Sequence, residues 1–159
     1  MPASIAAAPF DSRSTPNTAE AQFNKGYSHF QKGEIKEAMH WYSLAAQQGH
    51  PNAQYNLGLL YLNASSPNYA AAKELFEMAA EKKRTAAMMT LGFMYWEGNG
   101  VDKDTAKALT LLEDASALGN SSASYYLGII YYFGEEVPLD YAKALQYHAK
   151  AAEQGDPNG

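Results

Sequence analysis

A nine-residue pattern, A-x-x-x-L-G-x-x-Y, recurs along this chain and constrains its fold more than any other feature. Copies lie at residues 53–61 and 123–131, and a third, opened by Ala86 or Ala87, ends at Tyr95. A looser copy keeps an aromatic ring, a glycine and a second ring at residues 23–30. Self-similarity with a period of a few tens of residues is typical of helical repeat proteins, in which each unit buries its apolar face against the next. The pattern therefore predicts a stack of similar helical units.

Between these copies lie second segments in which pairs of small residues occupy aligned positions. We name the segments that carry the nine-residue pattern A helices, and the segments that lie between them B helices. The step from the first residue of a B-helix pair to the next A-helix glycine is always 13 residues: 45 to 58, 79 to 92 and 115 to 128. The opposite step, from an A-helix glycine to the following pair, is 19, 21, 23 and 23 residues. A fixed junction between units, combined with a surface turn of variable length, predicts a solenoid.

Short polar side chains mark the predicted helix starts. Asn68, Asp104 and Asp140 stand at equivalent places before B helices, where each is predicted to cap the free amides of the first turn. Asn17 and Glu20 predict a capping box for the first A helix, so ordered structure should begin near residue 18. Glycines that follow the B helices predict the turns between repeats: Gly49, Gly119 and Gly155.

The pattern also places a glycine in the interior of each A helix. An interior glycine costs about 1 kcal/mol of helix propensity relative to alanine, so a packing gain must offset it. We expect close approach of the paired B helix, with small residues of that helix facing the gap. The glycines are Gly26, Gly58, Gly92 and Gly128, and the small residues include Ala72, Ala108 and Ala144.

The third and fourth units share the most specific residues. Five residues of the third unit recur 36 residues later, so that Gly98, Val101, Asp104, Lys107 and Ala108 match Gly134, Val137, Asp140, Lys143 and Ala144. On these residues the chain resembles the Sel1-like repeats, a subgroup of the tetratricopeptide-like helical repeats. The resemblance covers about residues 19–155, although the first unit has a shorter turn and the second lacks the glycine and valine of the turn.

The resemblance implies an all-α, right-handed superhelical solenoid of about four helix-turn-helix repeats. We place these repeats at about residues 19–50, 51–84, 85–120 and 121–155. Residues 1–18 are predicted to form a flexible N-terminal tail, because a segment rich in proline and serine buries too little apolar surface to order itself. Residues 156–159 are predicted to form a C-terminal turn.

Composition disfavours several classes of function. The chain has no cysteine, which excludes disulfides and thiolate sites, and its formal charge of −5 argues against a nucleic acid partner. No apolar window reaches the roughly 20 residues of a membrane span. The start lacks an intact signal peptide, which slightly favours the cytoplasm. The four histidines lack ligand-like spacing and no nucleophile stands beside a base, so we expect no metal, no cofactor and no enzymatic activity.

The family resemblance implies an adaptor or scaffold that binds another protein or peptide. Tetratricopeptide-like arrays line their concave surface with A helices, and residues three before, one after and four after each glycine are expected to face this groove. All of these residues are apolar or aromatic, which favours a groove for a partner peptide or helix, whereas a spacer should expose a polar face. The predicted partner-binding residues are Phe23, Tyr27, Tyr55, Leu59, Met89, Phe93, Trp96, Tyr125, Ile129 and Tyr132.

Three alternatives stay open at this point. The first is that the array is a structural spacer within a larger multi-repeat or multi-domain protein, and the second is that it is a hydrolase. The third is that the residues near the A-helix ends pack against adjacent repeats instead of facing the groove: Phe30, Leu62, Trp96 and Tyr132. Glu135 and Glu136, adjacent in a predicted loop, are interpreted as a solvated edge rather than a catalytic pair.

The last predicted B helix has no A helix after it in this sequence, although residues 155–158 resemble the turn at residues 49–52. We expect this helix to expose a face that contains some of Leu145, His148, Ala149 and Ala152. Repeat arrays without a polar cap tend to associate. The pattern therefore predicts self-association through the C-terminal repeat, or an array that continues in a longer protein.

Overall fold

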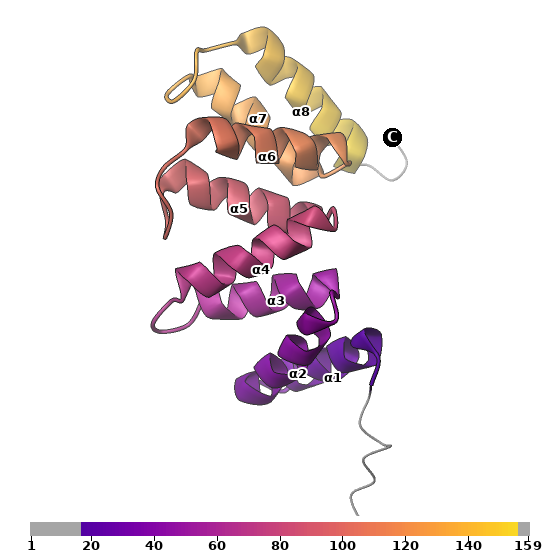
Figure 1. The fold of residues 1–159 in the computed structure, drawn as a ribbon. Helices are drawn as coiled ribbons and strands as arrows, with labels where there is room; N and C mark the ends of the chain where they lie inside the picture. Colours follow the sequence, from indigo (N-terminus) through magenta and orange to yellow (C-terminus); the bar gives the residue numbers. More distant parts are fainter. Residues whose placement is uncertain (1–16, 156–159) are drawn as a thin grey trace, which may run out of the picture.

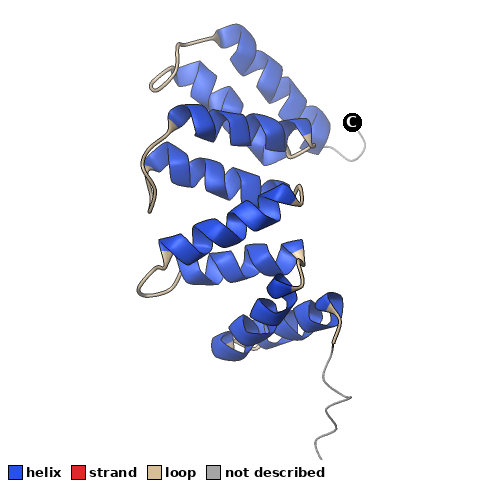
Figure 2. Ribbon diagram, viewed as in Figure 1, coloured by secondary structure: helices blue, strands red, loops and turns tan. Residues whose placement is uncertain are grey.

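The computed structural model describes residues 17–155, which fold into helices joined by short connections (Figure 2). Most of the tail predicted for residues 1–18 and all of the turn predicted for residues 156–159 lie outside the described residues. The described part contains eight helices and no strand. Their bounds are Ala19–Gln31 for α1, Ile35–Gln47 for α2, Pro51–Leu62 for α3, Tyr69–Glu81 for α4, Thr85–Glu97 for α5, Thr105–Ala117 for α6, Ser121–Phe133 for α7 and Tyr141–Gly155 for α8.

The helices alternate as the repeats predict, with α1, α3, α5 and α7 as A helices and α2, α4, α6 and α8 as B helices. They stack in chain order from α1 and α2 at the bottom of Figure 1 to α7 and α8 at the top. Each of α2, α4 and α6 packs against the A helix before it and the A helix after it. The chain is therefore an all-helical solenoid, as predicted.

The connections differ in the way that the spacing predicts. Every B-to-A turn contains three residues, at 48–50, 82–84 and 118–120. The A-to-B connections contain three, six, seven and seven residues, at 32–34, 63–68, 98–104 and 134–140. The three longer connections lie together on the left of Figure 1. The fixed junction stacks the repeats, and the variable connections lie along one edge of the stack.

Polar side chains begin the helices, with one correction to the predicted caps. The side chains of Asn68, Asp104 and Asp140 each accept a hydrogen bond from the backbone amide three residues later, at 2.9 to 3.1 Å. These three predicted N-caps are confirmed. The predicted cap of α1 is wrong by one residue, because Thr18 rather than Asn17 accepts the first-turn amide, at 3.2 Å.

The interior glycines allow close approach of the paired B helix, but of large side chains rather than small ones. A Cβ atom at Gly58 would lie 2.7 Å from Cε1 of Phe76, which is fully buried. The corresponding pairs are Gly26 with Tyr42, Gly92 with Leu112 and Gly128 with His148. The expectation that Ala72, Ala108 and Ala144 face these gaps is therefore wrong for their side chains, because the side chain four residues after each of them fills the gap. The backbone carbonyl oxygen of Ala108 also lies near, 3.4 Å from a Cβ atom placed at Gly92.

The alanines instead form part of the core between helices. Ala38, Ala72, Ala108 and Ala144 are at most 2% exposed, and Ala144 packs in one cluster with Leu127 of α7. Within residues 17–155, no helix has both the length and the apolarity that a membrane span would require.

Candidate protein-binding surface

We call the surface formed by α1, α3, α5 and α7 the A-helix face. The predicted binding residues lie on these four helices, but the structure exposes them to different degrees. Tyr27, Tyr125 and Tyr132 are 46%, 52% and 51% exposed. They belong to the first and the fourth described repeats, where a neighbouring repeat lies on one side only. The aromatic side chains that are free to meet a partner therefore concentrate at the two ends of the face.

The remaining predicted residues are half-buried, because they also pack against the core. The Tyr55 ring lies 5.8 Å from the Phe76 ring, and the Arg84 guanidinium lies over Tyr55 at 5.3 Å from its centroid. The Phe93 ring packs edge-on against Tyr126 of the next A helix at 4.8 Å. The half-buried predicted residues are Phe23, Tyr55, Leu59, Met89, Phe93, Trp96 and Ile129.

The A-helix face has a mostly apolar hollow of about 370 Å³ between α1 and α3, which we call the α1–α3 hollow. Tyr27 and Leu59 line it from the two A helices, and Tyr42 of α2 lies at its base with 1% exposure. The Asn56 amide donates to the Tyr42 hydroxyl at 3.3 Å. Burial raises the pKa of Tyr42, partly opposed by this hydrogen bond, so the phenol stays neutral at physiological pH. The complete lining is Tyr27, Phe30, Tyr42, Asn56, Leu59, Leu60 and Asn63.

A smaller hollow of about 140 Å³, the α5–α7 hollow, lies between the next-to-last and the last A helix. Trp96 of α5 and Ile129 of α7, both predicted binding residues, line it together with Phe133. Glu135 and Glu136 of the α7–α8 connection complete its rim. This hollow differs from the first because carboxylates stand beside its apolar walls.

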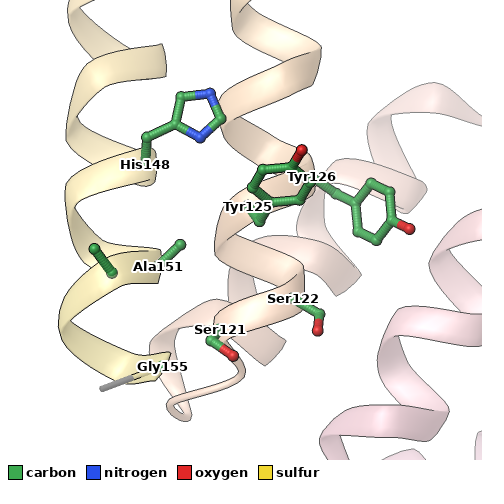
Figure 3. Close-up of a pocket in the computed structure, with 8 residues that line it drawn as sticks. Ser121, Ser122, Tyr125, Tyr126, His148, Ala151 and Gly155 are labelled. Atoms are coloured by element: carbon green, nitrogen blue, oxygen red, sulfur yellow. The ribbon is translucent and has the colours of Figure 1, made fainter.

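A third and more open hollow, of about 540 Å³, lies between α7 and α8 (Figure 3). In Figure 3 His148 points from α8 toward α7, and Tyr126 points away from α8. The rings of Tyr125 and His148 lie 5.6 Å apart. Ala151 and Ala152 also line this hollow, whereas the equivalent Ala45 and Ala46 in the first repeat are buried under α3. The α7–α8 hollow therefore occupies the place where a following A helix packs in the earlier repeats.

Most of the A-helix face is apolar, since α1 is the only one of its four helices that contains more than one charged residue. The helices α3 and α7 contain no charged residue, and α5 contains only Glu97. Residues 17–155 contain no group of three histidine, aspartate or glutamate side chains that could hold a metal ion. The apolar rings and the three hollows are its distinguishing features.

Sequence reasoning missed several residues that line the hollows between neighbouring A helices. Asn56, Leu60, Ile130 and Phe133 lie two before, two after or five after an A-helix glycine, outside the three positions that were considered. Of the residues among which some are predicted to be exposed on α8, Leu145 is 72% exposed, whereas His148 packs against Gly128 and is half-buried. Apolar residues recur two after the glycines at Leu60, Met94 and Ile130, a signal that points to the hollow-lining positions of Leu60 and Ile130, although Met94 is buried in the core.

Comparison with known proteins places the repeats in a family. The sequence matches the Sel1 repeat family four times, over residues 19–50, 51–83, 85–120 and 121–156. The structure is similar to that of c5321, a protective antigen present in uropathogenic Escherichia coli strains, with 38% sequence identity and a TM-score of 0.79. A Sel1 repeat protein from Oxalobacter formigenes is similar at 32% identity and a TM-score of 0.79. Each likeness covers 88% of this chain, and 31% and 60% of those two chains.

A curated relative is named for the assembly to which it belongs. The ERAD-associated E3 ubiquitin-protein ligase component HRD3B of Arabidopsis thaliana is 36% identical over 75 residues, which cover 45% of this chain and 11% of the relative. The matches to the first curated relatives cover between 8% and 21% of the length of those proteins.

Proposed function

Since this chain belongs to the Sel1 repeat family, we propose that it is an adaptor or scaffold module that binds a segment of another protein on its A-helix face. The segment is a peptide or helix with apolar side chains. Some of its apolar side chains occupy the α1–α3 hollow, and others pack against the exposed rings of Tyr125 and Tyr132 at the other end of the face. The proposal assigns binding rather than catalysis to the array.

The α1–α3 hollow is the observation that carries this proposal. Tyr27 and Phe30 are 46% and 44% exposed at its rim, so their rings can bury further surface when a partner side chain enters. Removing apolar surface from water contributes about 25 cal/mol per Å², and aromatic anchors carry a disproportionate share of interface energy. A spacer needs no such exposed rings beside an apolar hollow, so the exposure of Tyr27 and Phe30 favours a binding module over a spacer. The HRD3B relative, a component of a ubiquitin ligase, is consistent with a role within a protein assembly.

The test is selection of a random twelve-residue peptide library, displayed on phage, against the intact chain. Affinities of the selected peptides, made synthetically, are then measured by fluorescence anisotropy. We expect Tyr27→Ala and Tyr125→Ala each to weaken binding by about 1–3 kcal/mol. Both side chains are about half exposed, so the variants should keep the helical circular dichroism of the parent.

Glu37→Ala is the matched control, because Glu37 is exposed on α2, away from the A-helix face. It should leave the affinity unchanged. Selected peptides that bind both tyrosine variants as tightly as the parent would show that the A-helix face is not the binding surface. A library that yields no binder would favour the spacer.

A further inference from the structure

Aromatic rings and carboxylates meet at the α5–α7 hollow. Phe133 is 61% exposed there, next to the half-buried Trp96 and the exposed Glu135. An aromatic ring attracts a cation to its face, and a carboxylate accepts charge-assisted hydrogen bonds from the same cation. The chain already uses the first contact internally, since the Lys107 ammonium lies 4.2 Å from the centroid of the Tyr95 ring.

Charged residues lie at both ends of the A-helix face: α1 contains Glu20 and Lys25, and carboxylates stand beside the α5–α7 hollow. Glu97, next to Trp96, is the only charged residue in α5, and α3 and α7 contain none. Glu135 and Glu136 add two carboxylates at the rim of the hollow. Apolar walls of low dielectric constant strengthen the field of nearby charges. A cation that reaches the α5–α7 hollow therefore meets the carboxylates of Glu135 and Glu136, of which only Glu136 has a cationic partner within residues 17–155, Lys103.

The carboxylates at this rim are not equally available. Glu136 accepts from the Lys103 ammonium at 2.6 Å, which joins the α5–α6 and α7–α8 connections. Glu97 accepts from the Asn99 amide at 2.5 Å. Glu135 has no ion-pair partner among the side chains of residues 17–155. It is the carboxylate that can meet a cation of the bound segment without breaking an existing contact.

On the basis of the proposed function, we propose that the bound segment carries a basic residue beside one of its apolar anchors. The apolar side chain fills the α5–α7 hollow, and the basic side chain lies against Phe133 and Glu135. Arginine fits better than lysine, because its planar guanidinium stacks on a ring and donates two parallel hydrogen bonds to a carboxylate. An acidic residue at the same place of the segment is repelled.

The test uses the peptides selected from the random phage library on the intact chain. We expect arginine or lysine to be enriched next to an apolar residue in the selected sequences. Glu135→Gln should weaken the binding of such a peptide about two- to fivefold, and replacing its arginine by uncharged citrulline should weaken binding by a similar factor. Glu135→Gln and the citrulline replacement together should weaken binding by less than the product of the two factors, because both remove the same contact. In 1 M salt the difference between Glu135→Gln and the parent should vanish.

Two further variants separate the ring from the carboxylate. Phe133→Leu keeps an exposed apolar side chain but removes the aromatic face, so it should reduce the preference for arginine over citrulline. Glu37→Gln removes a carboxylate on α2, away from the hollow, and should change neither the affinity nor its salt dependence.

The outcomes distinguish this inference from the proposed function. Peptides that lose affinity in Tyr27→Ala but show no basic residue, or that bind Glu135→Gln as tightly as the parent, overturn the inference and leave the apolar binding face in place. Peptides that bind Tyr27→Ala and Tyr125→Ala unchanged overturn the proposed function and this inference with it.

Discussion

Replacing Gly58 by alanine tests whether the interior glycines exist to admit a large side chain. The added Cβ would lie 2.7, 3.0 and 3.1 Å from three carbon atoms of the Phe76 ring. Two carbon atoms in van der Waals contact are about 3.5–4.0 Å apart, so the ring must move by several tenths of an ångström. Phe76 is fully buried in the core shared by α4 and α5, and a buried rigid ring has little room to move.

Two opposing effects set the size of the change. Overpacking a well-filled core costs about 1–3 kcal/mol, and a rigid buried ring places this site at the upper end. The gain in helix propensity from glycine to alanine is about 1 kcal/mol. We therefore expect Gly58→Ala to lower the free energy of unfolding by about 1–2 kcal/mol. Gly92→Ala is the matched control: its nearest atom is Cγ of Leu112 at 3.3 Å, a smaller overlap that the helix gain offsets.

Urea unfolding followed by circular dichroism measures both variants by linear extrapolation. The third repeat suggests a rescue, because it pairs its glycine with leucine instead of phenylalanine. Phe76→Leu should therefore cost less stability in the Gly58→Ala background than in the parent, with a coupling energy of about 1 kcal/mol. The glycines do not serve the contact with the ring if Gly58→Ala and Gly92→Ala have the same stability. The same conclusion follows if the effects of Gly58→Ala and Phe76→Leu are additive.

Two other expectations concern pH and association. Burial raises the pKa of Tyr42, Tyr131 and Tyr147, so their contribution to stability is complete below the ordinary pKa of 10.0 and is lost as pH rises through the raised values. Thermal unfolding should shift to lower temperature above about pH 10, and less so in Tyr42→Phe; an equal shift in that variant contradicts the assignment to Tyr42. Leu145 is 72% exposed on α8, and we expect the chain to self-associate through this face. Sedimentation should show Leu145→Glu as more monomeric than the parent, and a parent that stays monomeric at high concentration refutes the prediction.

The architecture could be predicted because the repeat pattern encodes contacts that recur. The tyrosine of the pattern shows how: the backbone N–H of Asp104 donates to the Tyr95 carbonyl at 2.9 Å, and Asp140 donates to Tyr131 in the same way. Lys107 and Lys143 then lie over those two tyrosine rings. The residues that carry the resemblance between the third and fourth units therefore hold the long connection against its A helix. Such local and repeated contacts leave a trace in sequence spacing.

The binding surface could be predicted only in part, because exposure depends on neighbours that spacing does not count. Tyr55 and Tyr125 hold the same position in their repeats, yet Tyr55 is covered by Arg84 of the following turn, while Tyr125 is 52% exposed beside the α7–α8 hollow. The filling of the glycine gaps was mispredicted for a related reason. Small residues in both helices suggested mutual contact, whereas Phe76, one turn beyond Ala72, reaches into the gap.

The two kinds of connection in this array have different structural consequences. The three-residue B-to-A turns fix how one repeat packs on the next, so the apolar floor of the A-helix face continues from α1 to α7. The A-to-B connections lie along one edge and can lengthen without disturbing that packing. The seven-residue connection after α7 brings Glu135 to the rim of the α5–α7 hollow, whereas the six-residue connection after α3, at the equivalent place, brings Asn63 to the α1–α3 hollow. If the surface binds a segment as proposed, its charge preference can change by altering one connection, while the core beneath it stays the same.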